Sequence, residues 1–169
     1  MPGCDLHRPG AVALVASHPL ARLERTICFG WCPEYVVEID SDGKLTYRGG
    51  DNVMTVGLAT GHLSADQLKS LREATARARQ AEMPHEECAC GCMTDVLFVE
   101  LTTWDNGVAR TISYDQGCKR APDAIRGLEK EIDRVVGIER WIGTEAARKA
   151  CFEERRDCRS LTGVPEPTP

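Results

Sequence analysis

The chain has 169 residues, a length that suits one domain of ordinary size. Apolar residues make up 42% of it and aromatic residues only 5%, so aliphatic side chains must fill most of a core. The formal net charge of -5 argues against a dedicated nucleic-acid-binding protein, which needs a basic face. No apolar run approaches the roughly 20 residues that span a bilayer, so we expect no transmembrane segment.

The N-terminal segment, residues 1–21, is expected to be partly flexible or to supply an edge strand. Its apolar stretch 11–16 is shorter than the roughly 7 to 15 residues of a signal-peptide core and suits a first strand equally well. The small residue Gly3 before Cys4 resembles a lipoprotein processing site. A lipid anchor at Cys4 is therefore the alternative to a disordered terminus with an incidental cysteine.

Residues 35–49 carry the clearest hairpin pattern. Apolar residues alternate before and after the turn residues Asp42 and Gly43, as they do in two paired strands with one buried face. The segment 52–63 can add a third strand. A helix is expected from Ser64, an N-cap that completes a capping box with Gln67, to about Gln80. Its apolar face is formed by Leu68, Leu71, Ala74 and Ala78.

The second half repeats this order of hairpin and helix. Alternating residues on either side of the turn 105–107 predict a second hairpin. Pro122 suits the first turn of a second helix. The apolar residues of that helix recur at helical spacing: Ile125, Leu128, Ile132 and Val135.

Antiparallel hairpins that pack one face on helices give an α+β domain. We predict an antiparallel sheet of about five strands from two hairpins, covered by two helices. The expected organisation is one domain over residues 22–143, a cysteine-containing helical appendage over 144–160 and a flexible tail over 161–169.

Several segments together resemble a bacterial family of domains of unknown function over residues 22–142. Its hallmark is Cys-Phe-Gly-x-Cys-Pro-x-Tyr, matched here by the octapeptide that begins at Cys28. The matching residues are Cys28, Phe29, Gly30, Cys32, Pro33, Tyr35, Asp42, Gly43, Tyr47, Gly49, Asp95, Pro122 and Trp141. The resemblance implies a single compact domain, often exported or in a lipoprotein, and it implies no activity.

Nine cysteines are many for a chain in a reducing compartment, so disulfides and metal-bound thiolates compete as explanations. Cys28 and Cys32 would have Cα atoms about 13 Å apart in an extended segment. A disulfide needs less than about 7 Å, hence a turn, which Gly30 permits. A structural disulfide is the preferred interpretation, with metal ligation and redox catalysis as alternatives, because redox pairs usually precede a helix.

The loop that starts at His85 is the sharper chemical signal. His85, Cys88, Cys90 and Cys92 supply four soft ligands within eight residues, a density that favours Cu(I) or Zn(II). Their spacing is tighter than in usual zinc fingers. Disulfides from this loop to other cysteines, Cys118 among them, are the competing interpretation.

Cys151 and Cys158 lie seven residues apart in the expected C-terminal helix. An intact helix holds two such residues about 10.5 Å apart along its axis, too far to bond each other. Each is expected to pair elsewhere, unless the helix breaks between them.

The sequence contains no nucleophile elbow (Gly-x-Ser-x-Gly), no phosphate-binding loop and no zinc-protease motif, so no known motif indicates an enzyme. The sequence predicts a non-catalytic, disulfide-stabilised binding or interaction domain of the cell envelope, or a secreted one, with no cofactor and an unknown protein or small ligand as partner. Trp31 and Tyr35 are its candidate binding contacts. The first alternative is a cytoplasmic copper- or zinc-binding protein that uses the His85–Cys92 loop, and the second is a thiol redox protein that uses Cys28 and Cys32.

Overall fold

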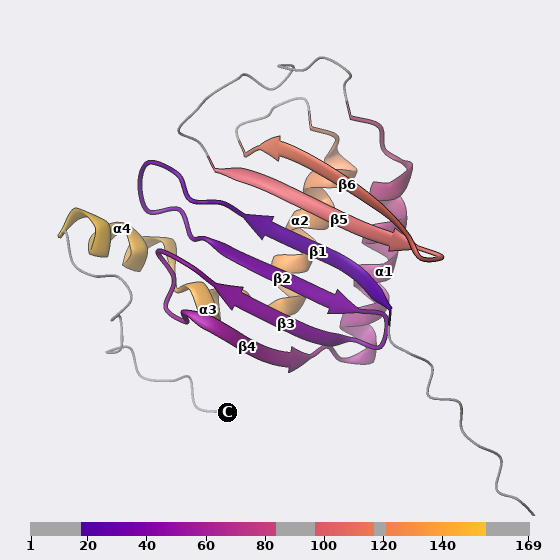
Figure 1. Ribbon diagram of the computed structural model, residues 1–169, viewed down its shortest axis with the longest axis horizontal. Coiled ribbons are helices and arrows are strands. Elements are labelled where there is room, and N and C mark those ends of the chain that lie inside the picture. Colours follow the sequence, from indigo (N-terminus) through magenta and orange to yellow (C-terminus); the bar gives the residue numbers. More distant parts are fainter. Residues whose placement is uncertain (1–17, 84–96, 117–120, 155–169) are drawn as a thin grey trace, which may run out of the picture.

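The computed structural model describes residues 18–83, 97–116 and 121–154. Their strands form one antiparallel sheet in the order β4-β3-β2-β1-β5-β6, and helices α1 and α2 lie together against one face of it (Figure 1). The strands are β1 (Pro19–Arg25), β2 (Tyr35–Asp40), β3 (Lys44–Gly49), β4 (Gly57–His62), β5 (Phe98–Asp105) and β6 (Val108–Asp115). The helices are α1 (Ala65–Gln80), α2 (Asp123–Val136), α3 (Glu139–Ile142) and α4 (Glu145–Glu153). The fold is therefore α+β, as predicted.

The sheet has six strands rather than about five, and the difference lies in β1. This strand begins at Pro19 and lies in the middle of the sheet, paired with β2 on one side and β5 on the other. The expectation of a partly flexible segment or an edge strand over residues 1–21 falls mostly on residues 1–17, which lie outside the described residues. Ala21 and Leu23 point to the helical layer and are buried, and a central position pairs the backbone of β1 on both sides.

Both predicted hairpins are present. Strands β2 and β3 turn at Asp42 and Gly43, and β4 adds the expected third strand beside β3. Strands β5 and β6 turn at Asn106 and Gly107, whose φ angles are 49° and 78°. Two consecutive residues with positive φ match the tight turn that follows the right-handed twist of paired strands.

Helix α1 begins as predicted, because Ser64 accepts a hydrogen bond from the backbone N–H of Gln67 while the Gln67 side chain accepts one from the Ser64 N–H. Helix α2 follows Pro122 and ends at Gly137, which adopts the left-handed conformation common after a helix. The predicted apolar faces of both helices are buried.

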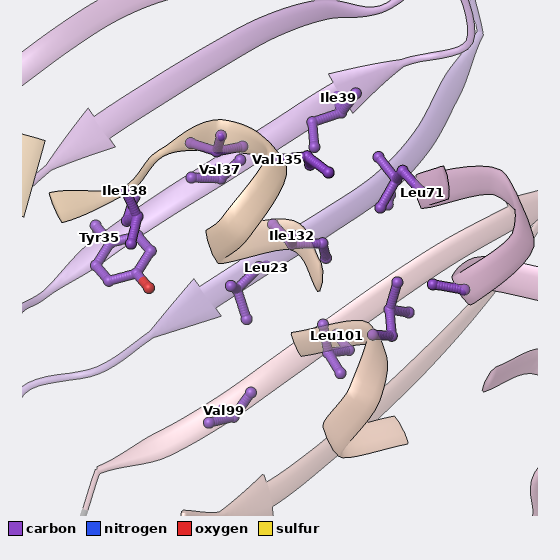
Figure 2. Close-up of a cluster of buried hydrophobic side chains, with 14 of the residues drawn as sticks. Leu23, Tyr35, Val37, Ile39, Leu71, Val99, Leu101, Ile132, Val135 and Ile138 are labelled. Carbon is purple, nitrogen blue, oxygen red and sulfur yellow. The ribbon is translucent and has the colours of Figure 1, made fainter. Parts of the chain in front are cut away.

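The core lies between the sheet and these two helices. Figure 2 shows Leu23, Val37 and Leu101 from three neighbouring strands pointing toward Leu71 of α1 and Ile132 of α2. All five side chains are almost fully buried. Burial of an aliphatic side chain of this size contributes roughly 1.5–3 kcal/mol, so this layer supplies the main stabilising force.

Helices α3 and α4 lie at one end of the sheet (Figure 1). The Trp141 ring of α3 packs on the ring of Tyr47 of β3 at a tilt of 33°, with 4.7 Å between ring centres. Helix α4 is capped by the Thr144 hydroxyl and ends at Glu153. The rest of the segment expected over 144–160, with Cys158, lies outside the described residues from residue 155 on. None of the described helices is long and apolar enough to cross a membrane.

Candidate functional site

The segment Thr26–Glu34, which connects β1 to β2, is the most distinctive surface feature of the described residues; we call it the disulfide loop. Cys28 and Cys32 are bonded within it, with Sγ atoms 1.95 Å and Cα atoms 5.6 Å apart. The turn that this bond requires occurs at Gly30, whose φ of 150° other residues rarely adopt. A five-residue covalent ring therefore stands at the end of the sheet.

The ring carries the aromatic side chain of Phe29 outward. Phe29 is 89% exposed, and Ile27, just before the ring, is 52% exposed. Isolated apolar residues are common on protein surfaces, but Phe29 lies inside a covalently closed turn that restrains its backbone. The loop thus presents an apolar tip that the rest of the described structure leaves uncovered.

Hydrogen bonds hold both ends of the disulfide loop to the sheet. At its start, the backbone N–H of Thr26 donates to Phe98 O at 3.1 Å, and the Phe98 N–H donates to Thr26 Oγ1 at 3.0 Å. Near its end, the Asn52 side-chain amide donates to Cys32 O at 3.1 Å. The backbone N–H of Asp51 donates to the carboxylate of Glu34 at 3.0 Å. The disulfide is therefore one of several restraints on this loop.

Helix α4 contacts the same loop. The Trp31 ring meets the ring of Phe152 edge-on at 6.2 Å, and Lys149 Nζ lies 5.4 Å from the centre of the Trp31 ring. Edge-to-face pairs and cation–π contacts each contribute roughly 0.5–1.5 kcal/mol. Trp31 consequently joins the loop to the C-terminal helix and does not stand free in solvent.

A buried charge network lies directly beneath the loop. Arg25, the last residue of β1, contacts Glu129 and Asp133 of α2, each at 2.6 Å. Tyr35 Oη accepts from Arg25 Nε and donates to Asp133, both at 2.7 Å. Tyr114 Oη of β6 donates to the other oxygen of Glu129 at 2.7 Å. This network joins three strands to α2 through fully paired polar groups.

The titration behaviour of the network follows from its burial. Desolvation raises the pKa of Asp133, and the positive charge of Arg25 and the Tyr35 hydroxyl only partly oppose that rise. Burial likewise raises the pKa of Tyr35 and Tyr114 well above the ordinary phenol value, and the adjacent carboxylates Asp133 and Glu129 add to the shift. The two phenols therefore stay neutral and act as hydrogen-bond donors at any ordinary pH.

A cavity of about 410 Å³ opens between the disulfide loop, the start of β5 and α4. Cavities of this size hold small organic molecules in many proteins. Its described lining combines apolar walls with two arginines and two carboxylates: Arg25, Trp31, Cys32, Pro33, Tyr35, Leu97, Gln116, Asp133, Ile142, Glu145 and Arg148. The loop, the network and the cavity thus occupy one end of the molecule.

The candidate binding and disulfide residues predicted from the sequence differ in where they lie in the structure. Trp31 is half-buried at the cavity wall, whereas Tyr35 is buried in the charge network and offers no exposed contact surface. Cys151 of α4 is also buried and takes part in a disulfide bond. The remaining candidate residues lie outside the described residues: Cys4, His85, Cys88, Cys90, Cys92, Cys118 and Cys158.

The sequence interpretation missed the exposed Phe29 and the buried Arg25, Asp133 and Arg148. A signal was present for two of them. Arg25 continues the inward alternation of Ala21 and Leu23, and Asp133 lies four residues after Glu129 beside the apolar stripe of α2. Charged residues at inward positions on two elements indicate a buried ion pair.

Within the described ranges, no group of three or more His, Cys, Asp or Glu side chains is arranged to hold a metal ion. The proposed copper or zinc ligands lie outside those ranges, so this finding does not test them.

Comparison with known proteins gives a family and no activity. A family model described as a domain of unknown function, DUF6438, matches residues 19–136, from the start of β1 to the end of α2. No curated protein matches the chain. The charge network and the disulfide loop fall inside the matched region, and α3 and α4 follow it.

Proposed function

The chain belongs to the DUF6438 family of domains of unknown function, and we propose that it is a non-catalytic interaction domain that binds a protein partner through the tip of its disulfide loop. The observation that carries this proposal is the 89% exposed Phe29 within the Cys28–Cys32 ring. Exposed aromatic residues on rigid supports are typical anchors of protein interfaces.

The physical advantage of this loop is its low conformational freedom. A flexible loop loses entropy when it binds, at a cost of roughly 0.5–1.5 kcal/mol for each side chain that becomes ordered. The disulfide, the Asn52 amide and the Thr26–Phe98 hydrogen bonds restrain the disulfide loop before any partner arrives. An apolar pocket on the partner then gains most of the transfer free energy of the Phe29 ring.

The position of the disulfide supports binding over thiol redox chemistry. A redox-active cysteine usually begins a helix, whose dipole stabilises the thiolate. Here Cys32 is followed by Pro33 and strand β2, and no helix of the described residues begins at either cysteine. Soft-metal binding by the His85–Cys92 loop stays a separate proposal with its own test, the metal content of the purified chain.

The disulfide also supports an oxidising location. Such bonds persist outside the cytosol, and we propose the cell envelope or the extracellular space as the place of action. An unknown protein partner in that compartment is the expected ligand of the disulfide loop.

The test places a photo-crosslinking phenylalanine analogue at residue 29 of the full chain in its native host. The matched control carries the analogue at Leu58, which is 66% exposed on edge strand β4. We expect a discrete covalent adduct at position 29 and none at position 58, and we expect Phe29→Ala to abolish co-purification of that adduct's partner. Adducts at neither position, or equally at both, would overturn the proposal.

A further inference from the structure

Arg148 of α4 is a buried cation with no carboxylate partner among the described residues. It is only 9% exposed, and its Nη1 group donates to the backbone carbonyls of Ile142 and Gly143. Its Nε atom is buried and has no hydrogen-bond partner among the described residues. A buried polar group left in this state costs roughly 1–3 kcal/mol, more when it is charged, so it needs an explanation.

The contrast with the other buried arginine is informative. Arg25 meets two carboxylates at 2.6 Å, whereas no carboxylate of the described residues lies within 4 Å of the Arg148 guanidinium. Burial lowers the pKa of Arg148, and the carboxylate of Glu145 only partly opposes this from a distance. Neutral carbonyls fix the position of the side chain but leave its positive charge uncompensated.

This cation forms part of the wall of the cavity beside the disulfide loop. The carboxylate of Asp133 in the same wall is already paired with Arg25 and Tyr35. The carboxylate of Glu145 lies in the exposed first turn of α4. Arg148 is therefore the polar group of the cavity with the least compensated charge.

The rest of the wall is mixed. The side-chain amide of Gln116 is polar, whereas Trp31, Pro33, Leu97 and Ile142 give the wall its apolar part. Pockets that combine apolar walls with one or a few placed polar groups are typical of small-molecule sites, in which the polar group fixes the orientation of the ligand.

We propose that this cavity binds a small organic carboxylate that carries an apolar or aromatic group. The carboxylate accepts from the Arg148 guanidinium, which presents donors in a fixed planar fork suited to that anion. The apolar group lies against Trp31 and Ile142. This inference is independent of the proposed protein partner, because it concerns the cavity and not the exposed Phe29.

The first experiment titrates the full-length protein with phenylacetate and, in parallel, with phenylacetamide. The two probes share ring and shape and differ in charge. We expect phenylacetate to bind with an affinity at least roughly tenfold higher than that of the amide, which corresponds to one charge-assisted hydrogen bond. Equal binding of both probes, or binding of neither, would overturn the proposal.

The second experiment repeats the phenylacetate titration on Arg148→Gln and on the control Arg126→Gln, a partly exposed arginine of α2 outside the cavity wall. We expect a loss of at least roughly tenfold in affinity for the first variant and no change for the second. Equal affinities would refute a role of Arg148.

If Arg148→Gln does not fold, the wild-type protein still provides a direct measurement. The Nε–H resonance of Arg148 should shift on addition of phenylacetate and not of phenylacetamide. An Arg148 resonance that stays unchanged while other cavity residues respond would show that the anion binds elsewhere.

Discussion

Two arginines of strand β1 show how burial decides how much an ion pair contributes to the stability of the fold. Arg25 faces the helices and contacts Glu129 and Asp133, with 8% of its side chain exposed. Arg22 faces the opposite side of the sheet, where it meets three carboxylates with 24% of its side chain exposed. Arg22 has more carboxylate partners than Arg25, but water screens its ion pairs and weakens their contribution to stability.

We therefore expect opposite outcomes for the two substitutions. Arg25→Gln leaves two carboxylates buried without a cation and should lower the free energy of unfolding by roughly 3–5 kcal/mol. Arg22→Gln should lower it by no more than about 1 kcal/mol. Urea denaturation followed by circular dichroism measures both. Similar losses for the two variants would show that the buried network is not a stabilising centre of the fold.

Local patterns explain which elements the sequence predicted correctly. The hairpins at Gly43 and Gly107 and the capping box at Ser64 each depend on residues that are close in the chain, and all three are found as expected. Strand β1 was missed because its inward alternation ends in Arg25, a residue that a search for apolar periodicity discards. Its place between β2 and β5 depends on pairing across about 80 residues.

The disulfide loop allows a prediction at the level of an element. The Cys28–Cys32 bond closes a ring of five residues, for which the chain-entropy relation gives a stabilisation of roughly 2 kcal/mol. The double variant Cys28→Ser/Cys32→Ser should therefore melt several degrees lower than the wild type, because 1 kcal/mol shifts the melting temperature of a chain of this size by roughly 2–4 °C. Differential scanning calorimetry measures the shift.

A second readout separates stability from loop order. In the same variant the Asn52 amide and the Thr26–Phe98 hydrogen bonds can still hold the ends of the loop. We expect faster amide hydrogen exchange at residues 28–32 and unchanged exchange in β3. A melting temperature equal to that of the wild type would mean that these hydrogen bonds, and not the disulfide, set the loop conformation.

At the scale of the molecule, the candidate site is assembled from segments that are far apart in the chain. Its cavity combines the disulfide loop, the start of β5 and helix α4. The sequence indicated that the cysteine pair needed a turn, yet it carried no sign that Arg148 and Trp31 would line one cavity. Long-range packing of this kind depends on the tertiary fold, which local periodicity does not encode.

All three tyrosines of the chain are part of this packing, which makes alkaline pH a probe of the whole fold. Burial raises the pKa of Tyr35, Tyr47 and Tyr114 in the folded state far above the value of about 10 expected when unfolded. The unfolded chain then releases protons above pH ~10 that the folded chain retains. Stability is consequently unaffected by these groups below that pH and falls as the pH rises beyond it.

Three such groups give a slope of about 4 kcal/mol per pH unit once all are ionised in the unfolded chain. Phenolate absorbance and far-ultraviolet circular dichroism should therefore change together in one steep transition above pH ~10. Tyr47→Phe should reduce the tyrosine contribution to that slope by about a third, because it removes one titrating phenol, whose hydroxyl donates to the Thr55 carbonyl. Gradual phenolate formation near pH ~10 with an intact dichroism spectrum would mean that the tyrosines are open to solvent and that the charge network around Tyr35 is not closed.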